Sequence, residues 1–302
     1  FVNDTNQLSI FKKNITVYGS TEDRFTLKNY INVSLKKKIF LSTSTQYIKK
    51  FISLVKDNEI NILEVHNRPN YIDYLDKFFI CKKILYFHND PQDMQGSKSV
   101  AERINLLNKT DKIIFNSNWS KLRFLESLPH SLNFDKINVI HQSTSKVKIN
   151  FKKKKKIISF VGKLNSSKGY DAFGEAILKI LRKYPNWKSI VIGDEPREKL
   201  NFKHKNLNHL GYKDNPYILN KLKEVSISVV PSKWDEPFGR SSLEAASRGS
   251  ALIISNTGGL RETTNDSVII NNVTAKNIYK KIEYLIKNKK FRQDLQKSAY
   301  KN

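Results

Sequence analysis

Two glutamates, Glu236 and Glu244, stand eight positions apart in residues 234–249, which read WDEPFGRSSLEAASRG. Carboxylates accept hydrogen bonds from hydroxyl groups, so such a pair could hold two parts of one ligand. Glu244 also has a local alternative. With Ser241, where a helix is predicted to begin, it has the spacing of a capping box, in which both side chains satisfy N–H groups that open a helix. Local grounds alone favour that role for Glu244, whereas Glu236 precedes Pro237 outside the helix and needs another one.

Two lysines and a helix start could together hold a phosphate. The N-terminus of a helix offers free N–H groups to an anion, and Gly239 would let a ligand approach the backbone closely. Lys163 and Lys168 follow a different predicted strand. These features predict a diphosphate site. Because Glu236 would repel a phosphate, it is expected to face an uncharged group with hydroxyls, such as a sugar, and a ribose would suit Glu244.

The elements that must position these residues follow a βαβ rhythm. Short β-branched runs alternate with amphipathic segments, which is typical of parallel sheets. Strands are predicted within residues 14–18, 60–66, 83–88, 112–118, 137–141, 156–162, 188–193, 226–230 and 251–255. Apolar residues at i, i+3 and i+4 spacing predict a helix over residues 170–184. The fold class is therefore α/β.

Polar side chains recur where the predicted strands end. His66, His88, Asn116 and Lys163 each follow a strand. In open α/β sheets, ligands bind outside the carboxyl ends of the strands. Taken singly, each residue could be a strand cap, a turn former or a surface lysine. Their recurrence in both halves favours two Rossmann-like domains that face each other across a cleft.

Length and composition favour two domains. The chain has 302 residues, 39% of them hydrophobic, which is enough for two ordinary cores. Residues 146–156 are polar, charged and without periodicity, so the boundary is expected there, with domains at residues 1–148 and 149–302. The chain begins FVNDTNQ, with no initiator Met and no signal-peptide pattern, so a preceding segment is expected.

The formal net charge of +26 invites a nucleic-acid interpretation. Lysine greatly outnumbers arginine and accompanies abundant Asn and Ile, which indicates a general residue bias rather than a binding face. Only residues 152–156 form a dense basic block, and no nucleic-acid-binding signature accompanies it. Nucleic acid is therefore not expected as a partner, whereas attraction to anionic lipid headgroups is compatible with the charge.

The single cysteine, Cys81, excludes an internal disulfide framework and a zinc site built on cysteines. That usage suits a reducing compartment, so a cytoplasmic location is expected. No apolar run reaches the roughly 18 to 20 residues needed to span a bilayer. Peripheral contact with the inner face of the cytoplasmic membrane stays compatible with the composition.

Motifs in residues 151–302 resemble those of the GT-B retaining glycosyltransferases of family 4, the group that includes bacterial lipopolysaccharide and polysaccharide sugar transferases. The motifs are Gly162-Lys163-Leu164, Lys168-Gly169, Pro231-Ser232, Glu236-Pro237-Phe238-Gly239, Leu243-Glu244-Ala245 and Gly258-Gly259-Leu260 with Glu262. In the first half the resemblance is looser and rests on the strand order, on HNRP and HNDP and on NSNWSK.

The resemblance implies transfer of a hexosyl-type sugar from a nucleotide diphosphate sugar to a glycan or lipid-linked acceptor, with retention at the anomeric carbon. It assigns Glu236 to the donor sugar and Glu244 to the ribose, and it places His88 near the reacting sugar. The implied donor-binding residues are Gly162, Lys163, Lys168, Glu236, Phe238, Gly239, Arg240, Ser241 and Glu244. The family commonly has Arg where Lys163 stands, and lysine keeps the charge but loses the bidentate fork.

The resemblance also makes residues 1–148 the acceptor-side domain and residues 149–302 the donor-binding domain. The first strand of the family would precede FVNDTNQ and a crossing helix would follow Asn302, so a fragment of a longer enzyme is expected. No Asp-x-Asp occurs, which agrees with lysines and a helix dipole replacing a metal at the leaving group. Neither a metal nor a cofactor is expected. By analogy, the acceptor belongs to cell-envelope polysaccharide biosynthesis.

Two alternatives remain open. A GT-B sugar-nucleotide epimerase would share the fold and the donor but would need no acceptor. A non-enzymatic polyanion-binding protein would use the lysines generally, so loss of charge at residues 152–156 would matter more to it than a change at Glu236.

Overall fold

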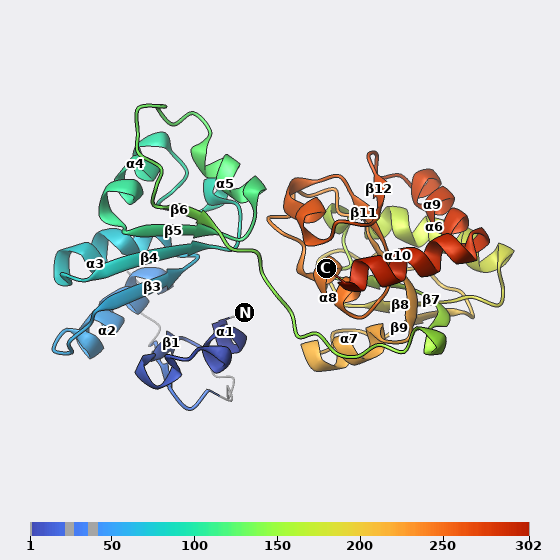
Figure 1. Ribbon diagram of the computed structural model, residues 1–302, viewed down its shortest axis with the longest axis horizontal. Coiled ribbons are helices and arrows are strands. Elements are labelled where there is room, and N and C mark those ends of the chain that lie inside the picture. The colour runs from blue at the N-terminus through green and yellow to red at the C-terminus, as the bar shows by residue number, and fades with distance from the viewer. Residues whose placement is uncertain (1, 22–26, 36–41, 302) are drawn as a thin grey trace. The chain divides into compact units, whose positions relative to one another are not determined.

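The computed structural model describes residues 2–21, 27–35 and 42–301 of the chain, which forms two compact units (Figure 1). The first unit comprises Phe1–Phe87, Pro91–Ile114 and Phe124–Asn138, and the second comprises His88–Asp90, Phe115–Arg123 and Val139–Asn302. The predicted domain ends, residues 1 and 302, lie outside the described residues. Two segments from the first half of the chain thus belong to the second unit.

The domain boundary predicted between residues 148 and 149 lies inside the second unit. The stretch before it has no regular structure, as its polar composition indicated, but side chains of the second unit hold it. Arg248 donates to the carbonyl of Ser145 at 2.5 Å, and the Tyr300 hydroxyl donates to the carbonyl of Val147 at 2.9 Å. Composition alone cannot predict such contacts, which link residues far apart in the chain.

The first unit has a four-stranded sheet in the order β3-β4-β5-β6 and a separate parallel pair, β1-β2. Its strands are β1 (Val17–Gly19), β2 (Tyr30–Asn32), β3 (Ile62–His66), β4 (Lys82–Phe87), β5 (Lys112–Phe115) and β6 (Ile137–Val139), with Phe115 and Val139 counted in the second unit. Its helices are α1 (Val2–Leu8), α2 (Thr43–Val55), α3 (Ile72–Phe78) and α4 (Val100–Lys109), while α5 (Asn118–Leu125) begins in the second unit. Strands β3 and β4 pair in parallel.

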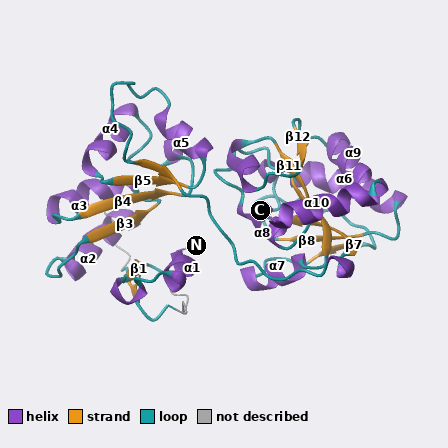
Figure 2. Ribbon diagram, viewed as in Figure 1, coloured by secondary structure: helices purple, strands orange, loops and turns teal. Residues whose placement is uncertain are grey.

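The second unit has a six-stranded sheet in the order β12-β11-β10-β7-β8-β9, and its five pairings are parallel. Its strands are β7 (Lys155–Val161), β8 (Lys188–Ile192), β9 (Leu207–His209), β10 (Val225–Val230), β11 (Ala251–Ser255) and β12 (Val268–Ile270). Its helices are α6 (Tyr170–Lys183), α7 (Asn215–Leu222), α8 (Arg240–Ser247), α9 (Ala275–Lys287) and α10 (Lys289–Lys301). Figure 2 shows helices flanking these strands.

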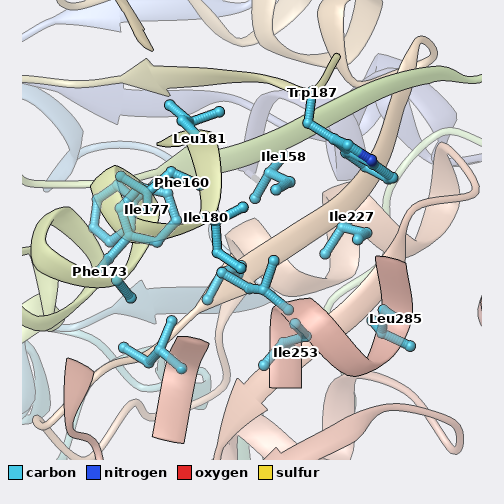
Figure 3. Close-up of a cluster of buried hydrophobic side chains, with 14 of the residues drawn as sticks. Ile158, Phe160, Phe173, Ile177, Ile180, Leu181, Trp187, Ile227, Ile253 and Leu285 are labelled. Carbon is cyan, nitrogen blue, oxygen red and sulfur yellow. The ribbon is translucent and has the colours of Figure 1, made fainter. Parts of the chain in front are cut away.

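Apolar side chains on alternate strand positions build a core on each face of this sheet, because successive residues of a strand point to opposite faces. Ile158 of β7 packs with Phe173 and Ile177 of α6 on one face (Figure 3). Its neighbour Ile157 packs on the other face, with Ala245 of α8. The sheet is therefore buried on both sides and leaves its strand ends to carry polar groups.

The nine predicted strands and the helix over residues 170–184 are confirmed, with small shifts at their ends. Sequence reasoning missed β2, β9 and β12, which have three residues each. Strands β1 and β6 are equally short and were predicted, so length alone does not account for these misses. No helix in the described part of the chain is long and apolar enough to cross a membrane.

Candidate functional site

The strand order of the second unit places two predicted loops side by side. Strand β7 lies between β8 and β10, so the direction of winding reverses between β7 and β10. Ligands of open α/β sheets bind at such a switch point, outside the carboxyl ends of the strands. The loop after β7 carries Lys163 and Lys168, and the loop after β10 carries Glu236 and Gly239. The structure therefore gathers these residues at one edge.

Lys168 and Glu236 form an ion pair across the two loops. The lysine Nζ lies 2.6 Å from Oε1 of Glu236, and their side chains are 28% and 15% exposed. The sequence assigned these residues to different parts of a ligand and did not predict their contact. The pair brings one cation and one carboxylate to the same point, where each neutralises and orients the other.

Backbone contacts fix the two loops to each other. The Ser167 carbonyl accepts hydrogen bonds from the N–H groups of Lys233 and Trp234 at 2.9 and 3.0 Å. Gly169 has a φ of +71°, and a Cβ at this position would collide with the carbonyl oxygen of Pro231. Only glycine combines that conformation with so close an approach. These backbone contacts therefore hold the Lys168–Glu236 pair in a defined position.

The loop after β11 supports Glu236 from its other side. The N–H of Gly259 donates to the Glu236 carbonyl at 2.7 Å, and the N–H of Gly258 donates to Oδ1 of Asp235 at 3.1 Å. Gly258 has a φ of +54°, and a Cβ there would lie 2.6 Å from the backbone nitrogen of Glu236. The two glycines thus set the position of the Glu236 backbone.

Glu244 does not form the capping box that its spacing with Ser241 predicted. Helix α8 begins at Arg240 after an N-cap at Gly239, and no side chain caps it. The carboxylate of Glu244 instead accepts from Asn215 Nδ2 at 2.7 Å and from Arg240 Nε at 2.9 Å. With Gly239 as the N-cap, Glu244 lies beyond the first turn and cannot reach the N-cap N–H. A long-range amide and a neighbouring guanidinium hold it instead.

The N-terminus of α8 opens toward the same loops. Gly239 has a φ of +100°, and a Cβ there would collide with the Leu260 side chain. Phe238 is buried, with 3% of its surface exposed, and its ring stacks on His141 with centroids 5.6 Å apart. The burial of Phe238 anchors the helix start. Arg240 and Ser241 occupy the first turn, where N–H groups have no intrahelical acceptor.

Lys163 extends from the loop after β7 into solvent. It is exposed, and its side chain forms no ion pair with any residue in the described ranges. Gly162, just before it, contacts the next loop, because a Cβ at Gly193 would collide with the Gly162 carbonyl. Lys163 is therefore an exposed cation that follows a closely packed glycine.

Acidic residues from the loop after β8 hold the rest of this segment. Asn165 donates to Glu195 at 3.2 Å, and the N–H of Ser166 donates to Glu198 at 3.1 Å. Hydrogen bonds from Arg197 lower the pKa of Glu195 to about 2, so it remains ionised at neutral pH. The sequence patterns did not indicate these roles, since the residues are close only in the folded sheet.

His88 belongs to the second unit, although sequence reasoning placed it in the first domain. Its Nδ1 lies 3.2 Å from Nε2 of Gln142, and its carbonyl accepts from Nδ2 of Asn116 at 2.9 Å. Asn116 Oδ1 lies 3.0 Å from Oγ of Ser120, which is itself 3.3 Å from the Pro237 carbonyl. A chain of polar contacts thus links the residues after β4, β5 and β10.

Glu262 caps the start of α5 from a distant part of the chain. Its carboxylate accepts from the N–H groups of Asn118 and Trp119 at 2.6 and 2.9 Å, and it lies 3.0 Å from His141 Nε2. A carboxylate suits the positive end of a helix dipole. Ser117, just before this helix, donates to the Pro237 carbonyl at 2.5 Å. Sequence reasoning included Glu262 in a motif but gave it no role.

The described residues contain no group of three or more His, Cys, Asp and Glu side chains placed to hold a metal ion. Lysines, backbone N–H groups and carboxylates at the switch point are the polar groups available to a ligand. Together they can bind an anion beside groups with hydroxyls. A diphosphate attached to a sugar and a ribose has both features, an anion and neighbouring groups with hydroxyls.

Comparisons with known proteins point to the same region. The model of a family described as "Glycosyl transferases group 1" matches residues 141–302. An uncharacterized glycosyltransferase of Methanocaldococcus jannaschii is 31% identical over 163 residues, which make up 49% of this chain and 40% of that protein. The matched part thus spans about two fifths of that relative's length.

Solved structures share the architecture. A glycosyltransferase from Rickettsia africae ESF-5 aligns over 99% of this chain and 87% of its own, with a TM-score of 0.73 and 19% identity. The Anabaena protein HepE in complex with UDP-glucose aligns over 84% of this chain and 76% of its own, with a TM-score of 0.66 and 14% identity. The predicted α/β class with parallel sheets is confirmed, and the solved GT-B glycosyltransferases that the chain resembles are consistent with two Rossmann-like domains.

Proposed function

The chain belongs to the glycosyl transferases group 1 family, and we propose that it moves a hexosyl-type sugar from a nucleotide diphosphate sugar to a glycan or lipid-linked acceptor. One observation carries the proposal. At the switch point of the second unit, the Lys168–Glu236 pair, the N-terminus of α8 and the carboxylate of Glu244 share one edge of the sheet. These groups match the diphosphate, the sugar and the ribose of a donor.

The diphosphate is bound by cations and backbone N–H groups. Lys163 is exposed and therefore accessible to a ligand, and Lys168 lies at the same edge. The first turn of α8, at Arg240 and Ser241, supplies backbone N–H groups and the positive end of a helix dipole. As the sugar leaves, this positive environment stabilises the negative charge that develops on the phosphate. We therefore propose that neither a metal ion nor a cofactor is needed.

The sugar and the ribose are bound by separate carboxylates. Glu236 is paired with Lys168, which positions its carboxylate next to the diphosphate, where it can accept hydrogen bonds from donor-sugar hydroxyls. Glu244 is fixed by Asn215 and Arg240 and can accept from ribose hydroxyls in the same way. His88 is proposed as a catalytic residue near the reacting sugar. Its contacts with Gln142 and Asn116, which belong to the second unit as it does, support this assignment.

Retention at the anomeric carbon, as in family 4, is part of the proposal. The leaving phosphate would depart from the face of the sugar that the acceptor attacks, and the phosphate itself would take the acceptor proton. We assign no separate general base. The acceptor is proposed to serve cell-envelope polysaccharide or lipopolysaccharide biosynthesis, at a cytoplasmic location with peripheral contact to the membrane.

Thermal unfolding with a panel of UDP-, GDP- and ADP-sugars, in the presence of EDTA, tests the proposal. A ligand at about 100 times its Kd stabilises the native state by about 2.7 kcal/mol, which raises Tm by roughly 5 to 10 °C. We expect such a rise with one nucleotide class and none with the free sugar. Lys163→Ala should reduce it, and Lys179→Ala, an exposed lysine on α6, should not.

Two results would count against the proposal. If no nucleotide sugar raises Tm, the donor site does not exist in this chain. If the rise occurs only after a divalent metal replaces EDTA, the diphosphate is not held by lysines and N–H groups alone.

A further inference from the structure

The amino ends of β7 and β10 border a surface lined by lysines. A hollow of about 620 Å³ lies among the residues before β7, the end of α7 and the turn into β10. Its lysines are Lys148, Lys153, Lys155, Lys221 and Lys223. A second hollow of about 760 Å³ shares Lys148 with the first and adds Lys152 and Lys297. Seven lysines from four parts of the chain therefore meet at this edge of the sheet.

The positive charge of this edge is largely unbalanced. Within the described ranges, Glu224 is the one acidic residue that lines either hollow, and its carboxylate lies 2.8 Å from Nζ of Lys155. The other six lysines form no ion pair with any described residue. Like charges gathered at one place repel each other, and a ligand with several negative charges would relieve that repulsion.

Lys154 removes a source of negative potential beneath this surface. Its ammonium group donates to the carbonyls of Leu222, Val225 and Arg248 at 3.2, 2.8 and 2.5 Å. Leu222 ends α7 and Arg248 is the C-cap of α8, so the Lys154 amine satisfies carbonyls at the carboxyl ends of two helices. Those ends carry partial negative charge that would weaken anion binding. The hydrogen bonds from Lys154 occupy these carbonyls, which leaves the surface lysines to set the local field.

We propose that this basic edge binds a ligand with several phosphate groups, supplied either by phosphate-bearing lipid headgroups or by a soluble oligophosphate. The basic edge is defined as Lys148, Lys152, Lys153, Lys221, Lys223 and Lys297. Lysine binds phosphate as a point charge, without the geometric demands of arginine. Because the lysines come from different segments that the fold brings together, the site depends on the native structure and not on the lysine run alone.

This site is separate from the donor site. Strand β7 has seven residues, so its two ends lie roughly 20 Å apart. The basic edge is at its amino end, and the loop with Lys163 and Lys168 follows its carboxyl end. A ligand at the basic edge would therefore leave the donor loops unobstructed. The proposal does not depend on the proposed function.

Co-sedimentation of the full chain with vesicles tests the proposal. The probes are vesicles of phosphatidylcholine alone, vesicles that also contain phosphatidylglycerol, and inorganic tripolyphosphate as a competitor. The test variant combines Lys148→Gln, Lys153→Gln and Lys221→Gln. The control variant combines Lys276→Gln, Lys280→Gln and Lys281→Gln, which removes the same charge from exposed positions on α9.

We expect binding to the anionic vesicles, competition by tripolyphosphate, a loss of roughly tenfold or more in the test variant, and a change below about twofold in the control. Tripolyphosphate binding without vesicle binding, lost in the test variant, would assign the site to a soluble phosphate. The proposal is wrong if neither probe binds or if both triple variants lose affinity equally. Should the test variant fail to fold, Lys148→Gln with Lys276→Gln as its control makes the same comparison.

Discussion

Lys168 and Glu236 contact each other in addition to the ligand group that each is proposed to bind. Lys168 was expected to bind phosphate and Glu236 to bind sugar, yet their side chains lie 2.6 Å apart. A diphosphate near Lys168 would share that lysine with Glu236, so a substitution of Lys168 also changes the surroundings of the carboxylate. Lys163 has no such partner among the described residues. Its substitution therefore isolates the contribution of a cation to phosphate binding.

Lys154 is a half-buried lysine whose protonation is coupled to folding. Burial lowers its pKa to about 7, while the three carbonyls that it faces act in the opposite direction. A lysine in the unfolded chain has a pKa of about 10.4. Between these values the unfolded chain binds more protons than the folded chain, so the free energy of unfolding should rise with pH from about 7 toward 10.

Urea unfolding at pH 7 and at pH 9 measures this contribution. Each pH unit within the window is expected to add up to about 1.4 kcal/mol to the free energy of unfolding of the wild type. Lys154→Met removes the titrating group and should flatten that dependence. Lys156→Met, at an exposed position of β7, should leave it unchanged. Equal slopes in all three proteins would show that Lys154 keeps an ordinary pKa when folded.

At the scale of elements, the close approach of the loops after β7 and β10 explains why the site residues meet. The two loops approach each other too closely at Gly169 to leave room for a side chain. Its φ is +71°, and a Cβ there would collide with the Pro231 carbonyl oxygen. Gly169→Ala should destabilise the protein by about 1 to 3 kcal/mol and should also weaken nucleotide binding, because the loop with Lys168 must move. Urea unfolding and calorimetric titration measure the two effects.

Gly211 provides a matched control for Gly169. Its φ is +67°, nearly the same, but a Cβ there would meet nothing within 4 Å. Gly211→Ala therefore carries the backbone strain without the collision. If Gly211→Ala lowers the free energy of unfolding as much as Gly169→Ala does, the positive φ alone explains the destabilisation. The close approach of Gly169 to Pro231 would then contribute nothing to stability.

The elements were largely predictable, and the reason for each miss is physical. Strands such as β7 and β11 are long and β-branched, so their pattern is clear in the sequence. The capping box at Ser241 failed because the Ser-x-x-Glu spacing is local, whereas Gly239 starts α8 and Asn215, from another helix, takes the Glu244 carboxylate. A local pattern cannot weigh a partner that lies 29 positions away.

At the scale of the molecule, the second unit contains every residue proposed to bind the donor, and His88 as well. The sequence placed His88 in the first domain because it follows a strand there. The contacts that join it to the second unit link residues far apart in the chain, such as Gln142 and His88, which are 54 positions apart. The fold class and the loops after β7 and β10 were therefore predictable from patterns, whereas the grouping of these segments required the structure.

Glu236 and Glu244 are proposed to serve different parts of one donor at the switch point. Calorimetric titration of the wild type with the preferred nucleoside diphosphate and with its sugar nucleotide tests this proposal directly, with Glu236→Gln, Glu244→Gln and the exposed Glu175→Gln of α6 as the variants. The Glu244 variant loses charge-assisted hydrogen bonds to the ribose, so its affinity for the free nucleoside diphosphate should fall roughly tenfold or more.

In the same titrations, Glu236→Gln should keep or increase affinity for the nucleoside diphosphate, because Lys168 becomes available to the phosphates, and it should lose the additional affinity that the sugar confers. Glu175→Gln should bind both ligands as the wild type does. Equal loss of nucleoside diphosphate affinity in the Glu236 and Glu244 variants, with Glu175→Gln unaffected, would contradict the account, since the two carboxylates would then not divide the donor between them.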